Sequence, residues 1–178
     1  MDPMALGKDY EAQDCALARA LELLGERWTL LIVRDAFYGV RRYGDFLAHL
    51  DIPRAVLATR LQALVDAGVL TRRPYQESPR RHEYVLTERG RELWPALNAL
   101  GHWGGEHLSP FGPSRLYTHL TCGTRVGRTG TCPACGRFAP PEELEVRPGP
   151  GADRPHRDDA VSRALRRPHR LLEPLLAE

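Results

Sequence analysis

Hydrophobic residues between positions 47 and 70 recur at the spacing of an amphipathic helix. They form one stripe: Ile52, Leu57, Leu61, Leu64 and Val65. The opposite face carries small, polar or cationic residues: Arg54, Ala55, Thr59, Arg60 and Gln62. Pro53 suits the first turn of a helix, because its missing N–H is not needed there. Gly68 suits the position just after the last turn. The pattern predicts a helix between these two residues with one buried face.

The flanking segments predict a short helix before this one and a hairpin after it. Residues 43–50 place Phe46, Leu47 and Leu50 on one side, and residues 51–52 make a turn. Residues 69–73 and 82–86 have the composition of strands, with a loop expected at 74–81. This is the element order of a winged helix-turn-helix. An ordinary amphipathic helix followed by a hairpin is the alternative.

Further helices are predicted on both sides of this motif. Residues 15–24 form an amphipathic helix, and residues 27–37 are apolar enough for the buried centre of a domain. Thr87 can cap a helix that runs towards His107 and that Pro95 should kink near its first turns. A small domain has little room for both Trp94 and Trp103. We therefore expect the first and last helices to pack against a second subunit, unless both tryptophans complete the monomer's own core.

The predicted fold class is mainly α (α+β), in three parts. Residues 1–110 form the winged helix-turn-helix and dimerisation domain, and residues 109–114 are predicted to be a linker. Residues 115–147 form a small β-rich, cysteine-containing appendage. Residues 148–178 form a second linker and an Arg-rich tail, with one or two short helices interrupted by Pro168 and Pro174.

Charge along the chain is unevenly distributed. Residues 1–38 carry four basic and seven acidic side chains, whereas residues 39–82 carry eight arginines and four acids. A basic concentration on a helix-turn-helix and its wing is typical of a protein that neutralises phosphates. A solvated basic surface is the alternative. No apolar run approaches the ~18 residues of a membrane span and no signal peptide opens the chain, which predicts a cytoplasmic protein without a membrane partner.

The appendage contains two similar pairs of metal-ligand residues. His119 and Cys122 precede Gly123, Cys132 and Cys135 precede Gly136, and nine residues separate the pairs. Two such turns can complete the four-coordinate shell of a structural Zn²⁺ site. A short segment with few aliphatic residues buries too little apolar surface to fold alone, so a bound metal ion would stabilise it. A reduced thiol pair or a redox-active Cys132–Cys135 disulfide is the alternative.

Three stretches of the chain resemble the HxlR-type transcriptional regulators, a branch of the MarR-related winged-helix proteins. They are CALARALELLGERWTLLIVRDAFYGVRRYGDF from residue 15, VLATRLQALVDAGVL from residue 56 and RRPYQESPRRHEYVLTERGRELWPALNALGHWG from residue 72. The resemblance implies a homodimer that binds a pseudo-palindromic operator in double-stranded DNA and usually represses neighbouring genes. Its two recognition helices would enter major grooves about one turn (~34 Å) or a small multiple apart.

The resemblance also implies roles for particular residues. The residues expected to face the major groove are Arg54, Ala55, Thr59 and Arg60. Those expected to contact phosphates are Arg41, Arg42 and Tyr43 at the preceding turn and Arg80 and Arg81 at the wing tip. Relatives tend to have Ser or Ala and then Arg-Asn at the start of this helix, where this chain has Pro53-Arg54-Ala55, so their operator sequences do not transfer.

Cys15 matches the position of the cysteine through which several family members sense oxidants, quinones or aldehydes. A thiol at a helix N-terminus can gain reactivity, although a small core side chain is the alternative. A small-molecule or redox effector is therefore expected as a further partner.

Two other functional classes compete with a DNA-binding regulator. One is a thiol-redox enzyme based on Cys132 and Cys135, but the chain shows no βαβ context, nucleophile elbow or phosphate-binding loop, so we expect no catalytic residues and no enzyme. The other is a protein-interaction module in which the cysteine-containing arm or the tail carries the activity.

Overall fold

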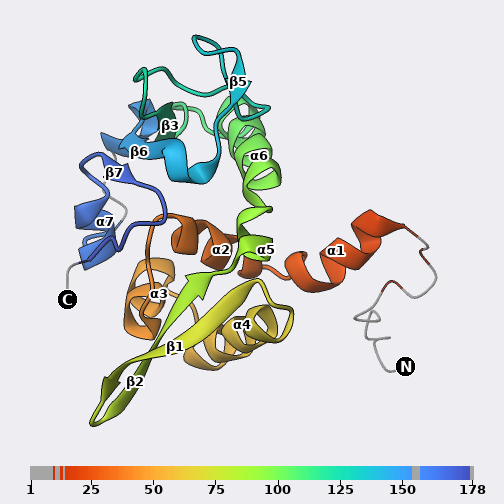
Figure 1. The fold of residues 1–178 in the computed structure, drawn as a ribbon, viewed down its shortest axis with the longest axis vertical. Helices are drawn as coiled ribbons and strands as arrows, with labels where there is room; N and C mark the ends of the chain where they lie inside the picture. Colours follow the sequence, from red (N-terminus) through yellow and green to blue (C-terminus); the bar gives the residue numbers. More distant parts are fainter. Residues whose placement is uncertain (1–9, 11–12, 14, 154–156, 177–178) are drawn as a thin grey trace.

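The computed structural model describes residues 10, 13, 15–153 and 157–176, and it confirms the predicted fold class (Figure 1). The winged helix-turn-helix unit contains α1 (Ala16–Leu24), α2 (Thr29–Phe37), α3 (Tyr43–Leu50), α4 (Arg54–Asp66), β1 (Leu70–Glu77), β2 (Arg80–Leu86), α5 (Glu88–Arg91) and α6 (Trp94–His107). The β-rich unit and the tail contain β3 (Arg115–His119), β4 (Thr131–Cys132), β5 (Arg137–Phe138), the 3₁₀ turn η1 (Pro141–Glu143), β6 (Leu144–Pro148), η2 (Pro150–Asp153), α7 (Ala160–Ala164) and β7 (His169–Arg170).

The predicted apolar stripe of α4 lies in the core. Leu57, Leu61 and Leu64 are completely buried, together with Ile32 of α2 and Phe46 of α3. Full burial of such side chains contributes about 1.5–3 kcal/mol each to folding. The hydrophobic periodicity therefore located α4 and the side of it that faces the protein.

The wing is longer than the sequence indicated. β1 and β2 pair from Leu70 opposite Leu86 to Glu77 opposite Arg80, so only Ser78 and Pro79 connect them. The loop expected over residues 74–81 is therefore wrong. An irregularity in the pairing between Pro74 and Gln76 accommodates a proline that cannot donate to the ladder.

The segment after the wing forms two helices instead of one kinked helix. Thr87 caps α5 as predicted, since its Oγ1 accepts a hydrogen bond from Gly90 N at 3.1 Å. Pro95 lies in the first turn of the separate helix α6, where a missing N–H breaks no bond. Trp94 is buried in the core, whereas Trp103 is half exposed. Trp94 thus completes the monomer's own core, whereas Trp103 remains available for packing against a second subunit.

The β-rich unit is a three-stranded sheet in the order β3-β6-β7 beside the small β4-β5 hairpin. The tail contributes the predicted short helix, α7, but beyond Pro168 it forms β7 rather than a second helix. β7 pairs with β6 through Val146 opposite His169, so the edge of β6 draws this segment into an extended conformation.

The last residues of the tail bind the winged unit. Leu172 N donates to Phe37 O at 2.8 Å and Leu175 N donates to Gly39 O at 3.1 Å. Arg41 Nη2 also donates to Leu172 O at 3.0 Å. The turn between α2 and α3 is therefore held by residues from the other end of the chain. Within the described residues, no helix combines the length and apolar character needed to cross a bilayer.

Gly39→Ala is expected to destabilise this contact. Gly39 has φ 84°, and an added Cβ would lie 1.7 Å from Glu173 O. A non-glycine residue strained in this way costs about 1–3 kcal/mol, which lowers Tm by roughly 2–4 °C per kcal/mol in a chain of this size. Thermal unfolding followed by circular dichroism measures the change. Gly44→Ala is the control, because its Cβ would meet nothing within 4 Å; an equal Tm for both variants would contradict the expectation.

Candidate DNA-binding surface and metal centre

The outward face of α4 carries the residues predicted to read bases. Arg54, Ala55 and Thr59 are exposed, and Thr59 Oγ1 donates to Ala55 O at 2.9 Å, which leaves the Thr59 methyl group free. Arg60 lies at the edge of this face, where its Nη2 is 2.9 Å from Glu26 Oε2. Arg60 therefore starts from an ion pair, unlike Arg54, which has no carboxylate within 4.0 Å among the described residues.

The turn before α3 supports α4 and the wing. Tyr43 donates its hydroxyl hydrogen to Arg54 O at 2.8 Å and so fixes the first turn of α4. The Arg42 guanidinium lies over the ring of Tyr75 at 4.7 Å from its centroid. Arg41 donates a hydrogen bond to Leu172 O, and its Nη1 lies 4.0 Å from Glu83 Oε2. These residues join the helix-turn-helix to the wing, and their predicted phosphate contacts remain predictions.

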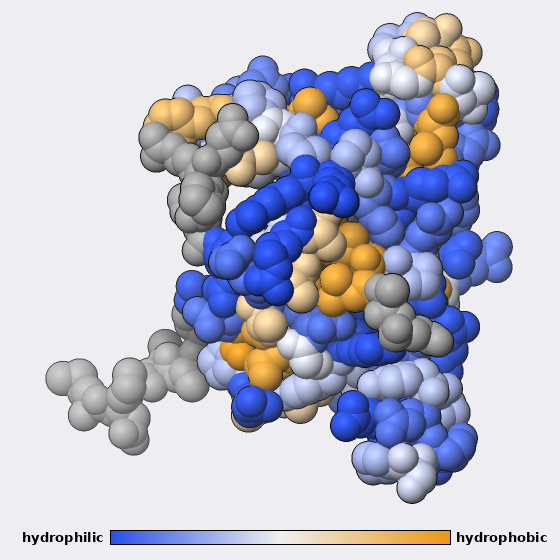
Figure 2. Space-filling model, turned by 90° about the vertical axis from the view of Figure 1, so that its left-hand side faces the viewer, coloured by the Kyte–Doolittle hydropathy of each residue, from blue (hydrophilic) through white to orange (hydrophobic). Residues whose placement is uncertain are grey.

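The wing presents further cations that the residue-level predictions omitted. Arg80 and Arg81 are exposed at the tip as expected, and Arg72 and Arg73 are exposed on β1. The tip, lowest in Figures 1 and 2, has a hydrophilic surface. Arg73 Nε donates to Glu83 Oε1 at 2.6 Å, whereas Arg72 lies beside His82, whose pKa is lowered by partial burial and by Arg72 and Arg80. Arg72 and Arg73 are among the eight arginines counted in residues 39–82. Their position on the surface of the wing became known only from the pairing of β1 with β2.

Two equivalent turns position the four predicted metal ligands. In the first, Gly123 N donates to His119 O at 2.7 Å, and in the second, Gly136 N donates to Cys132 O at 2.9 Å. Both glycines have a positive φ, 68° and 67°. Each turn thereby brings residues three positions apart to the same side, as the sequence predicted.

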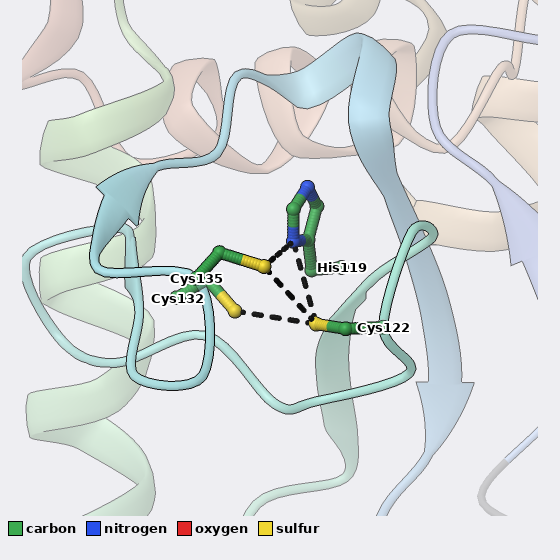
Figure 3. A group of neighbouring side chains, drawn as sticks. All are labelled: His119, Cys122, Cys132 and Cys135. Atoms are coloured by element: carbon green, nitrogen blue, oxygen red, sulfur yellow. Dashed lines mark hydrogen bonds between the residues drawn. The ribbon is translucent and has the colours of Figure 1, made fainter.

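The four ligand atoms converge on one point (Figure 3). All lie within 4.8 Å of one another. His119 Nδ1 is 3.5 Å from Cys122 Sγ and 3.4 Å from Cys135 Sγ. Cys122 Sγ is 3.4 Å from Cys132 Sγ and 3.6 Å from Cys135 Sγ. Tetrahedral bonds to zinc require edges of roughly 3.5–3.8 Å between such atoms. The cluster therefore has the dimensions of a four-coordinate metal site.

A carboxylate orients the histidine. His119 Nε2 lies 3.0 Å from Glu143 Oε2, to which Arg137 Nη2 also donates at 2.6 Å. The bond to Glu143 raises the pKa of His119, while Arg137, followed by His119, holds the pKa of Glu143 below its ordinary value. In the tautomer whose Nε2–H donates to Glu143, the Nδ1 lone pair is free to bind a metal, the arrangement common around metal-bound histidines. Neither Glu143 nor Arg137 was predicted, since neither has a recognisable spacing.

The electrostatics of the sulfur atoms also suit a cation. Hydrogen bonds from Thr124 are the largest cause that lowers the pKa of Cys122 to about 6. Interaction with Cys122 and Cys132 raises the pKa of Cys135 to about 11. Three thiolates this close repel one another, and a divalent cation between them removes that repulsion.

A buried amide attaches the metal cluster to α6. The Asn98 side chain is completely buried, and its Nδ2 donates to Gly127 O at 3.0 Å and to Arg128 O at 2.9 Å. These carbonyls belong to the loop between the two ligand turns. Trp94 of α6 also meets Tyr117 of β3 edge to face at 4.7 Å. The β-rich unit is therefore packed against the winged unit by side chains whose partners no sequence pattern identifies.

Cys15 lies apart from this cluster, at the N-terminus of α1. Its Sγ accepts a hydrogen bond from Ala18 N at 3.3 Å, and its side chain is exposed. The alternative of a buried core cysteine therefore does not apply.

Comparisons with known proteins agree with this architecture. The family model of the HxlR-like helix-turn-helix matches residues 23–111. An uncharacterized HTH-type transcriptional regulator of Mycobacterium tuberculosis is 47% identical over 137 residues, which cover 76% of this chain and 87% of the relative. Another from Synechocystis is 38% identical over 95 residues, 53% of this chain and 70% of the relative.

Two solved structures are similar as well. The crystal structure of PA1607, a candidate transcription factor, matches with a TM-score of 0.60 and 34% identity over 82% of this chain and 96% of that chain. The redox regulator HypR in its reduced form matches with a TM-score of 0.50 and 26% identity over 53% of this chain and 94% of that chain. Residues 1–110 are less than two thirds of the sequence, so the match to PA1607 continues into the β-rich unit. The chain therefore belongs to the HxlR-like family of DNA-binding transcriptional regulators, and it is not an enzyme.

Proposed function

We propose that this regulator is a homodimeric, sequence-specific repressor that binds a pseudo-palindromic operator in double-stranded DNA. We further propose that it acts in the cytoplasm and carries a structural zinc ion. The observation that supports it best is the exposed face of α4, where Arg54, Ala55 and Thr59 lie beside the cationic wing. Arg54 can pair with guanine, and the Ala55 and Thr59 methyl groups can contact thymine. Arg60 joins them once it leaves Glu26.

The phosphate-contacting residues surround this face. Arg42 and Tyr43 at the preceding turn and Arg80 and Arg81 at the wing tip are proposed to position the duplex. Arg41 has a second partner, Leu172 O. We therefore propose that Arg41 both stabilises the turn between α2 and α3 and attracts the phosphates.

Apolar surface on α1 and α6 supports the dimer. Leu17 is 67% exposed on α1, while Leu100 and Trp103 are 54% and 49% exposed on α6. Figure 1 shows α1 projecting from the side of the winged unit. Large apolar side chains exposed on a projecting helix favour burial against a second copy of the chain.

The metal proposed for the cluster is Zn²⁺, held by His119, Cys122, Cys132 and Cys135. Three thiolates and one imidazole are a donor set that zinc prefers. Four protein ligands leave no open coordination position, so the ion would crosslink the two turns and activate no substrate.

Cys15 is proposed as the redox-sensitive position. It is exposed at a helix N-terminus, and the similar protein HypR is described as a redox regulator. Oxidation of Cys15 would alter α1, and α1 belongs to the proposed dimer interface.

A gel shift on the gene's own upstream DNA, compared with scrambled DNA of equal length, tests the proposal. Preference for the upstream DNA at increasing salt is expected. Equal binding of both DNAs by folded, metal-loaded protein would contradict it.

Arg54→Ala and Arg81→Ala are expected to affect DNA binding differently. Loss of a base contact at Arg54 should cost about 1–3 kcal/mol on operator DNA and little on scrambled DNA. Loss of a phosphate contact at Arg81 should weaken both and reduce the salt slope by roughly one. Titrations at several salt concentrations measure both effects. Equal losses on the two DNAs for Arg54→Ala would exclude Arg54 as a base reader.

A further inference from the structure

A pocket of about 530 Å³ lies where the winged unit meets the β-rich unit. It is bounded by α2, α6 and β3, and Leu31, Leu97 and Leu116 are among its apolar lining residues. Its volume is within the range of about 300–1,000 Å³ that small-molecule sites occupy. The pocket is therefore large enough for an organic molecule.

Glycines on α6 leave this space open. Gly101, Gly104 and Gly105 line the pocket, along with Leu97 and Leu108 on the same stripe of the helix. A Cβ added at Gly101 or Gly104 would meet nothing within 4 Å. Glycine weakens a helix by roughly 1 kcal/mol relative to alanine, so packing within the chain gives no reason for these two residues.

The same stripe meets the proposed dimer surface at Leu100, which lines the pocket and is exposed, whereas Trp103 does not line it. Successive residues of a helix are turned by about 100°, which places Trp103 well away from the side that carries Gly101 and Gly104. A second subunit that buries Trp103 and the exposed edge of Leu100 can therefore leave the side of the pocket formed by Gly101 and Gly104 free.

The polar part of the pocket is cationic. Arg34, Arg115 and Arg125 line it, and none of the described acidic residues does. Arg34 is already paired with Asp35 at 2.7 Å. The Arg115 side chain donates to a carbonyl, Leu165 O, at 2.6 Å. In the described part of the chain, no carboxylate lies within 4.0 Å of Arg115 or Arg125.

Arg115 is the strongest reason to expect an anion. Its partial burial lowers its pKa, because the charged guanidinium is poorly solvated there, and the like charge of Arg34 acts in the same direction. Two hydroxyl groups lie near the same wall, with Tyr38 Oη 3.1 Å from Tyr117 Oη. A carboxylate could accept hydrogen bonds from the guanidinium and from one of these hydroxyls.

We propose that this pocket binds a small amphipathic carboxylate, with its carboxylate at Arg115 and its apolar body against the leucines and glycines of α6. The inference that this ligand is an effector rests on the proposed function, whereas the inference that it binds in the pocket does not. The pocket joins α2 of the winged unit to β3, so an occupant would contact both units.

Binding of 2-naphthoate to the metal-loaded full-length protein, measured by titration calorimetry without DNA, tests the proposal. The uncharged probe 2-naphthalenemethanol has the same ring system and is expected to bind about tenfold or more weakly, since it lacks the charge-assisted hydrogen bonds. Arg115→Met should weaken 2-naphthoate by a similar factor and leave the alcohol unchanged. Arg147→Met, which removes an exposed arginine from β6, is the matched control and should change neither.

Variants that fill the pocket provide a second test of the proposal. Gly104→Leu and, independently, Gly101→Leu should abolish binding of both probes without loss of helix content. The proposal is overturned if 2-naphthoate shows no saturable binding at millimolar concentration, if both probes bind equally, or if neither leucine variant weakens binding while remaining folded. Because DNA is absent, these outcomes are independent of whether the operator proposal holds.

Discussion

Cys132→Ser is expected to remove the bound metal and to unfold the β-rich unit. Cys132 is a completely buried member of the ligand cluster, so its replacement leaves three ligands around the cation. Zinc content should fall from about one ion per chain to near zero. Metal binding contributes an apparent 10–16 kcal/mol, roughly, in small zinc domains. Metal analysis, together with thermal unfolding by circular dichroism, measures both effects.

Loss of the β-rich unit should also weaken DNA binding. The tail that holds residues 37–41 is anchored to this unit through β7. A chelator should reproduce the effect on the wild-type protein. Cys15→Ser is the control and should retain its zinc, since Cys15 is outside the cluster. Full zinc content in Cys132→Ser, or an unchanged unfolding curve after metal removal, would show that the cluster is not a structural metal site.

Leu17→Glu is expected to convert a dimer into a monomer. A carboxylate at this exposed position of α1 would have to be buried unpaired in the interface, which is unfavourable by several kcal/mol. A monomer binds only one half-site, so the affinity for the operator should fall by about 10²–10⁴-fold. Light scattering gives the mass, and gel shifts on the operator give the affinity.

Ala58→Glu is the matched control for that variant. Ala58 is exposed on α4, on the proposed DNA-binding face, so the same charge there should weaken DNA binding without changing the mass. A wild-type protein that is monomeric at micromolar concentration would contradict the dimer, as would a Leu17→Glu variant that stays dimeric.

Local patterns in the sequence were sufficient to predict the winged helix-turn-helix. The stripe from Leu57 to Leu64 identifies α4 and its buried side because helical periodicity is a local property. The metal ligands were predicted for the same reason, since each turn is set by a glycine next to its ligands. The resemblance to the HxlR-type regulators was confirmed by the family match over residues 23–111.

Features that depend on distant residues could not be predicted. The strands of the wing extend through residues 74–77 because the two strands continue to pair, and pairing is not visible in either strand alone. Pro95 indicates either a kink or a helix start, and the burial of Trp94 in the core decides between them. The position of Asn98 against the metal loop and the pocket beside Arg115 arise only when the two units come together.

The attachment of the tail at Phe37 and Gly39 has a consequence for synthesis of the protein. Leu175 is paired with Gly39, which is synthesised 136 residues earlier, so the contact closes a long loop of the chain. The turn at residues 39–42 can therefore acquire its final arrangement only after the residues up to Leu175 have left the ribosome. Closing so long a loop is slow compared with forming local helices. We expect ribosome-bound chains that end before residue 170 to contain α2 and α4 but to leave the turn at residues 39–42 unprotected.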